Sequence, residues 1–174
     1  SISFDFSAGQ LVKASTSLSG IAFSNLEGIT PLNSLGCVDA KAFVTKSAKF
    51  IVDGVALAAS GVTLEISNEV SDRNYISSNG VGNKVVVGKS VTLNYTLDFV
   101  NTNELTKMKN NSKAEIFIEL INSAGDKVSI YLPVVSYSSV ELGNDGGVKT
   151  LSISSMAYND AEDNCLYIAT TKAP

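Results

Sequence analysis

Apolar and polar residues alternate along two stretches near the middle of the chain, residues 62–67 and 91–99. Because successive side chains of a strand point to opposite faces, this pattern predicts two strands that share one apolar and one polar face. The polar face is built from hydroxyl, amide and carboxylate groups. Its residues are Thr63, Glu65, Ser67, Thr92, Asn94, Thr96 and Asp98. The function of the protein depends on which molecules this polar face contacts.

Residues 68–89, between these two strands, have no clear period and few apolar members. We expect a long polar loop here. Loops of this length inside a compact domain are usually functional or disordered. Asp72, Arg73, Asn74, Tyr75, Asn79 and Asn83 are among its residues.

The rest of the chain predicts an all-β fold with one short α-helix, arranged as a β-sandwich or partly closed barrel. Expected strands cover residues 1–7, 40–44, 49–52, 55–59, 115–121, 127–132, 134–142, 148–158 and 166–169. Asp53 and Gly54 predict a tight type I′ turn, and Pro133 marks a strand end, a bulge or an edge. The helix is expected near residues 102–110, with Asn101 and Glu104 as a capping box.

We divide the chain into residues 1–60, which form N-terminal strands or an arm that packs on the main domain or on a neighbour, and residues 61–174, which form the main β domain. Residues 10–39 predict short strands and an extended arm. The sequence begins with Ser1 rather than Met, so we expect a processed or trimmed N-terminus, or one part of a longer subunit.

Composition excludes several functions. The chain of 174 residues is long enough to bury a core without a cofactor. It has no histidine, which excludes Ser-His-Asp and Cys-His catalysis and metal sites that use histidine. A net charge of −4 provides no positive field for nucleic acid, so nearby DNA is expected to pass rather than bind. Cys37 and Cys165 could form one disulfide or remain two buried thiols, and the thiols are expected of a cytosolic product.

Four segments together resemble the major tail tube protein of long-tailed bacteriophages. They are residues 62–70, residues 89–101 running into Glu104 and Leu105, residues 124–133 and residues 148–154. The resemblance implies a β-sandwich or partly closed barrel with one helix, a fold shared with type VI secretion tubes. It also implies a non-enzymatic virion protein that is made in the host cytoplasm and needs no cofactor or metal.

Proteins of this family assemble with themselves into stacked rings, usually hexameric or pseudo-hexameric, and contact other tail proteins. DNA passes through the resulting tube without specific binding. On this resemblance, Thr63, Glu65, Thr92, Asn94, Thr96 and Asp98 would face the lumen. The loop of residues 68–89 matches the family loop that reaches toward the neighbouring ring, and it would become ordered on assembly. On the same resemblance, its ring-stacking residues would be Asp72, Arg73, Asn74, Tyr75, Asn79 and Asn83.

Parts of the sequence are compatible with three other functions. An extracellular β-sandwich adhesion or carbohydrate-binding module would favour a Cys37–Cys165 disulfide and exposed aromatic residues. Glycoside hydrolysis would need paired carboxylates, for which Glu115 and Glu119 on one strand face are the neat pair. The acidic turn at residues 160–164 could hold calcium, although a solvated turn explains its residues better.

Overall fold

The structure is a computed structural model, and it describes residues 1–18, 41–45, 48–73 and 83–173, with only the backbone for Asp72, Arg73, Asn83 and Lys84. Within these residues it contains one α-helix, α1 (Asn103–Lys109). The strands are β1 (Ile2–Ser7), β2 (Lys13–Thr16), β3 (Lys49–Val52), β4 (Val55–Ala56), β5 (Ala59–Arg73), β6 (Asn83–Asp98), β7 (Lys113–Ile121), β8 (Lys127–Asp145), β9 (Val148–Ala157) and β10 (Tyr167–Thr171).

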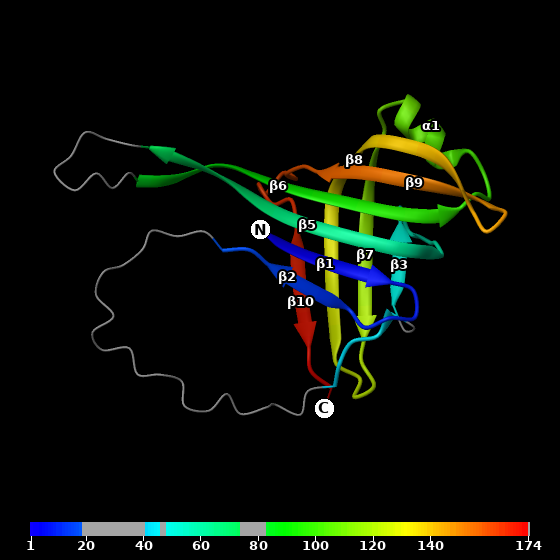
Figure 1. Ribbon diagram of the computed structural model, residues 1–174, viewed down its shortest axis with the longest axis horizontal. Coiled ribbons are helices and arrows are strands. Elements are labelled where there is room, and N and C mark those ends of the chain that lie inside the picture. Colours follow the sequence, from blue (N-terminus) through cyan, green and yellow to red (C-terminus); the bar gives the residue numbers. More distant parts are fainter. Residues whose placement is uncertain (19–40, 46–47, 74–82, 174) are drawn as a thin grey trace.

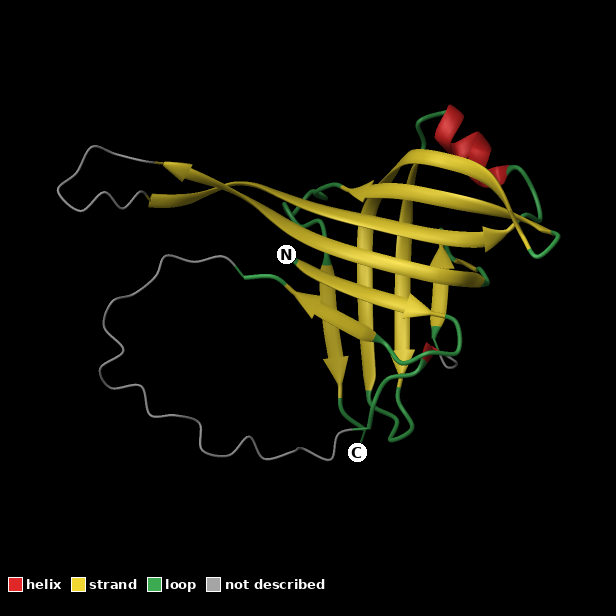
Figure 2. Ribbon diagram, viewed as in Figure 1, coloured by secondary structure: helices red, strands yellow, loops and turns green. Residues whose placement is uncertain are grey.

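All the strands belong to one antiparallel sheet with the order β2-β1-β5-β6-β9-β8-β7-β3-β4, and β10 pairs with the first half of β8 on the edge opposite β7. Within the described residues the sheet does not close into a barrel, because β2 ends it on one side and β4 on the other. Figures 1 and 2 show the sheet folded over on itself: β1, β5, β6 and β9 form a front layer, and β3, β7, β10 and the start of β8 cross behind it.

Strand β8 passes from one layer to the other. Its first half pairs with β7 and its second half with β9, and the register shifts near Pro133 and again between Tyr137 and Ser139. Bulges of this kind bend a strand, and strands that change sheets form the corners of crossed sandwiches. The bulge at Pro133 confirms one of the three roles expected for that residue, since proline cannot donate to the ladder.

The core lies between the two layers. Leu64 and Leu93 of the front layer belong to the same buried cluster as Ile116 and Leu132 of the back layer, and none of these side chains exposes more than 1% of its surface. Burial of one such side chain stabilises the fold by about 1.5–3 kcal/mol relative to leaving it in water. The alternation predicted for residues 62–67 and 91–99 is therefore confirmed, with the apolar face toward the core.

The prediction of a long loop over residues 68–89 is wrong about the length of the loop. Strand β5 continues to Arg73 and β6 begins at Asn83, so the two strands form a paired arm that extends beyond the body of the molecule (Figure 1). A sequence pattern misses such strands because no second layer covers the arm, so its residues need not alternate. Asn74, Tyr75 and Asn79 lie outside the described residues.

Other predicted boundaries also change. The two strands predicted around Pro133 are one strand, β8, and the strand predicted for residues 55–59 shrinks to β4 because Ala59 already pairs in β5. Of the strand predicted for residues 40–44, the described residues 41–44 form only isolated bridges, at Phe43 and Val44. The Asp53-Gly54 turn is confirmed by positive φ angles of 49° and 77°.

The predicted capping box is wrong as well. The helix begins at Asn103, whose N–H donates to the Asn101 side chain at 3.0 Å, while Thr102 makes no side-chain cap. Glu104 does not reach back to the cap because its carboxylate turns inward, where a tyrosine and a lysine bind it.

Candidate functional site

The predicted polar residues of β5 and β6 lie on one face of the front layer. Thr63 pairs across the ladder with Asn94, and Glu65 pairs with Thr92, so these side chains share the face that points away from the core. Thr96 and Asp98 continue the same face along β6, and none of the six is buried. The structure thus brings together all six residues predicted to face the lumen.

The polar face is wider than the sequence analysis indicated. Register pairs extend it to β9 on one side and to β1 on the other, and β8 and β2 add its two margins. The added residues are Ser3, Asp5, Ser7, Lys13, Ser15, Ser139, Glu141, Thr150, Ser152, Ser154 and Met156. We call this surface, with the six predicted residues, the hydroxyl-rich face.

The chemistry of the hydroxyl-rich face is nearly uniform. Most of its residues are serine or threonine, and its charged members are the four acids Asp5, Glu65, Asp98 and Glu141 and the single base Lys13 at its margin. The serines of β9 were not predicted, although Leu151 and Ile153, which alternate with them, carry the signal in the sequence. Such a face can form hydrogen bonds with water, but it offers little positive charge to a phosphate.

The arm carries exposed apolar side chains. Val70 of β5 pairs with Val86 of β6, and these residues expose 40% and 61% of their surface; Val85 and Val87 are exposed beside them. Residues Asp72, Arg73 and Asn83, predicted as loop residues, lie in the backbone ladder of the same arm. The run Val85-Val86-Val87 was the sequence signal for this apolar arm.

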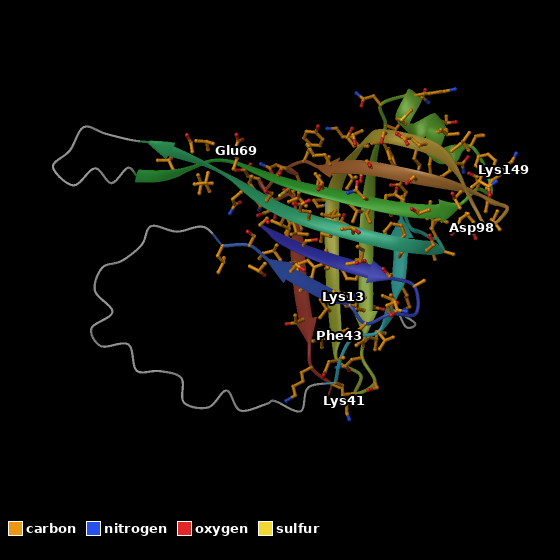
Figure 3. The ribbon with its side chains drawn as sticks, in the orientation of Figure 1. Lys13, Lys41, Phe43, Glu69, Asp98 and Lys149 are labelled. Carbon is orange, nitrogen blue, oxygen red and sulfur yellow. The ribbon has the colours of Figure 1, made fainter. Side chains whose placement is uncertain are left out.

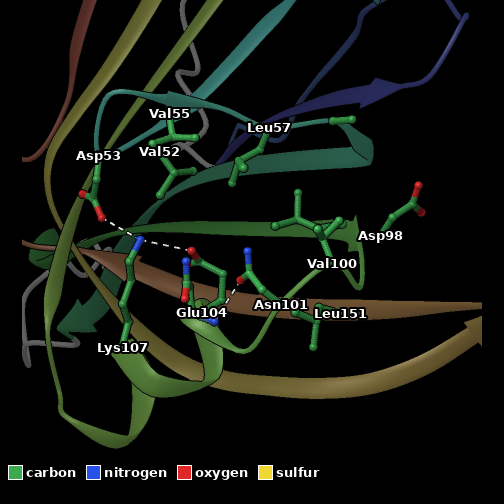
Figure 4. A pocket seen from close by; sticks show the side chains of 13 residues that line it. Val52, Asp53, Val55, Leu57, Asp98, Val100, Asn101, Glu104, Lys107 and Leu151 are labelled. Carbon is green, nitrogen blue, oxygen red and sulfur yellow. Dashed lines mark hydrogen bonds and ion pairs between the residues drawn. The ribbon is translucent and has the colours of Figure 1, made fainter.

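A partly buried polar network fastens α1 to the two layers, and Figure 4 shows its members Asp53, Glu104 and Lys107. Glu104 is buried, and its carboxylate accepts hydrogen bonds from the Tyr137 hydroxyl at 2.6 Å and from the Lys107 Nζ at 3.0 Å. Lys107 also contacts Asp53 Oδ2 at 2.7 Å, and Asp53 Oδ1 accepts the Glu115 N–H at 2.8 Å. The network therefore joins the helix, the β3–β4 turn, β7 and β8.

The network shifts the titration of its members. Burial lowers the pKa of Lys107, but the hydrogen bonds to Asp53 and Glu104 outweigh it, so the pKa of Lys107 is raised. Burial raises the pKa of the Tyr137 hydroxyl, which stays neutral and donates to Glu104. The neighbouring Tyr95 hydroxyl is also buried, yet it has no hydrogen bond of normal length within the described residues.

A pocket of about 420 Å³ opens beside this network, between α1, the β3–β4 turn and the end of β6 (Figure 4). Its wall is mainly apolar, and Val55 and Val100 at its mouth expose 59% and 84% of their surface. Its charged members are three carboxylates and one ammonium group. They are Asp53, Asp98, Glu104 and Lys107. We call it the helix pocket.

The other candidate sites have structural explanations. Glu119 pairs with Lys49 at 3.1 Å and Glu115 accepts the Tyr131 hydroxyl at 2.9 Å, so each carboxylate is occupied by its own neighbour. Asp160 accepts hydrogen bonds within the acidic turn and from Tyr167, which hold the pKa of its carboxyl below the usual range. The described residues contain no cluster of side chains suited to a metal ion.

Cys165 is a buried thiol in the core, whereas Cys37 lies outside the described residues. In the part of the chain that the structure describes, no helix is long and apolar enough to cross a membrane.

Comparison with known proteins identifies the family. The profile of the phage tail tube protein family matches residues 1–159. The fold is similar to a cryo-EM structure of the cap that terminates the tube of an anti-feeding prophage, with a TM-score of 0.46, 17% identity, and coverage of 71% of this chain and 89% of that one. A chain of the native gene transfer agent virion gives a TM-score of 0.44 and 11% identity, over 71% of this chain and 95% of that chain.

Among curated proteins, no sequence matches this chain significantly. The family match covers most of the chain and agrees with the mostly β fold with one short helix. It also favours a virion component over an adhesion module or an enzyme. The chain belongs to the phage tail tube protein family, whose members are non-enzymatic structural proteins of the virion tail that assemble with themselves and with other tail components.

Proposed function

We propose that copies of this protein form stacked rings, hexameric or pseudo-hexameric, whose channel is lined by the hydroxyl-rich face and conducts DNA during ejection. The observation that carries the proposal is the chemistry of that face: serine, threonine and asparagine with four acids and one marginal base. DNA is retained where cations neutralise its phosphates. A face without such cations lets the duplex pass without binding.

Open sheet edges provide a means to close the ring. Strands β2 and β4 end the described sheet, and β2 is exposed along its whole length. Unpaired edges readily pair with a neighbouring chain, and a repeated head-to-tail contact around an axis closes into a ring. We therefore assign to residues 1–60 a part in the contact with the neighbouring subunit, through β2.

The arm provides a means to stack the rings. Its valines are exposed in the single subunit, and its ladder extends beyond the second layer that covers the rest of β5 and β6. A two-stranded ribbon alone is marginally stable in water, so contact with a second ring would order it. Deletion of residues 72–82 is expected to leave a folded subunit that does not polymerise, and tubes of normal length from the deletion would contradict this role.

The channel is tested by adding positive charge to the hydroxyl-rich face. The double variant Thr92→Lys/Asn94→Lys is expected to form tubes that release DNA more slowly, and added salt should restore the rate because screening weakens phosphate contacts. Ser129→Lys/Ala169→Lys on the outer face of the back layer is the matched control. Equal ejection rates for the two variants, or a tube map with Leu93 and Tyr95 pointing into the channel, would refute the proposal.

A further inference from the structure

The arm continues the core-facing side of the front layer. Along β5, Leu64, Ile66 and Val70 fall on the same side of the strand, and Val86 faces that side too because it pairs with Val70. Leu64 is fully buried by the back layer, whereas Val70 and Val86 lie beyond that layer and are exposed. The arm is therefore an apolar surface that the subunit itself does not cover.

The helix pocket lies at the other end of the same strand. Strand β6 starts in the arm at Asn83 and ends at Asp98, which lines the pocket. Sixteen residues of strand span about 50 Å at roughly 3.3 Å each. Figure 3 shows Glu69 at the base of the arm and Asp98 at the opposite end of the long strands.

The two surfaces are both apolar, and their charges have opposite balance. The arm is a narrow ribbon that presents valines, and the helix pocket is a mainly apolar cavity with Val55 and Val100 at its mouth. Between residues 68 and 89 the sequence has three bases, Arg73, Lys84 and Lys89, and two acids, so this segment is positive in a chain of net charge −4. The pocket carries the opposite balance, three carboxylates against one ammonium group.

We propose that the arm of one subunit binds, through Val70 and Val86, in the helix pocket of a second copy in the next ring. The inference rests on the proposed function and names the surface that receives the arm. Because donor and acceptor lie at opposite ends of each subunit, the contact is head-to-tail and repeats without closing on itself along the tube axis. Every subunit of a ring makes the same contact, so a weak individual contact becomes strong for the ring as a whole.

The first test places a charge on either side of the contact. Val86→Asp and Val100→Asp each put a carboxylate where an apolar side chain would be buried, so each should raise the critical concentration for tube formation about tenfold or more. Both positions are exposed in the free subunit, and circular dichroism should show an unchanged fold. Val86→Ile and Val100→Ile keep the surfaces apolar and should assemble like the wild type.

The second test asks whether the two surfaces touch. Val86→Cys on a tagged subunit and Val100→Cys on an untagged one, both in a Cys37→Ser background, are assembled together and oxidised; the buried Cys165 is retained. A disulfide-linked heterodimer should predominate. The pair Val86→Cys and Ala169→Cys, with Ala169 on the outer face of the back layer, should give none.

The outcomes separate the two proposals. The contact would be overturned, and the proposed tube function would stand, if the wild type forms tubes but Val86→Cys gives no more heterodimer with Val100→Cys than with Ala169→Cys. Tubes of normal length from Val100→Asp would overturn the contact as well. A wild-type chain that forms neither rings nor tubes at any concentration would refute the proposed function and the contact with it.

Discussion

Two neighbouring buried tyrosines should respond in opposite ways to removal of one oxygen atom. The Tyr137 hydroxyl donates to the buried Glu104 carboxylate at 2.6 Å, whereas the Tyr95 hydroxyl is buried with no such partner among the described residues. Tyr137→Phe and Tyr95→Phe remove the same atom and keep the ring. Each variant is therefore the matched control of the other.

The expected magnitudes follow from these contacts. A hydrogen bond to a charged group contributes about 1.5–3 kcal/mol, and its loss leaves Glu104 buried with Lys107 alone, so Tyr137→Phe should lower the free energy of unfolding by about 2 kcal/mol. Tyr95→Phe removes a buried hydroxyl that lies beside the Tyr137 hydroxyl but makes no well-formed hydrogen bond within the residues described. It keeps the packing of its ring on Phe50, with centroids 4.9 Å apart, so its effect should lie between zero and a slight stabilisation.

Urea unfolding of the two variants, followed by circular dichroism at a concentration below that of assembly, measures the difference. With a slope of about 2 kcal/mol per molar urea, Tyr137→Phe should move the midpoint down by roughly 1 M, and Tyr95→Phe should leave it in place. Equal losses in the two variants, or a larger loss for Tyr95→Phe, would show that Glu104 does not depend on Tyr137. The network would then not be what fastens α1.

Three further predictions concern the turns and the core. Asn122→Ala should cost about 2–3 kcal/mol in urea unfolding, since the Asn122 side chain donates to Lys41 O and to Asp126 and accepts two backbone N–H groups in the β7–β8 turn. Leu132→Ala should cost about 3–5 kcal/mol in the same assay because this fully buried side chain would leave a cavity. The hydrogen bond that Tyr167 donates to Asp160 raises the pKa of Tyr167 from 10.0 to about 12. The stability that this bond contributes is therefore present below pH 10 and is lost as the pH rises toward 12. Absorbance at 295 nm, compared with that of Tyr167→Phe, should show this late titration.

The proportion of the fold that the sequence predicts depends on how local the signal is. Alternation over residues 62–67 and 91–99 gave the two central strands and the polar residues on their outer face, because the direction of a side chain in a strand depends only on its position along that strand. The Asp53-Gly54 turn was equally local, since its positive φ angles depend on those two residues alone. The arm was missed for the converse reason: without a covering layer, Val85, Val86 and Val87 show no period that marks a strand.

The tertiary structure alone decided which local elements meet. Alternation cannot say that β9 and β1 flank β5 and β6, and this pairing is what widens the predicted polar residues into a continuous hydroxyl-rich face. The network of Glu104 joins residues 53, 104, 107 and 137, which only the fold brings into contact. The sequence by itself determined the chemistry of each strand face, because that is a property of neighbours along the chain, whereas the helix pocket and the bend of β8 depend on distant segments that pack together in three dimensions.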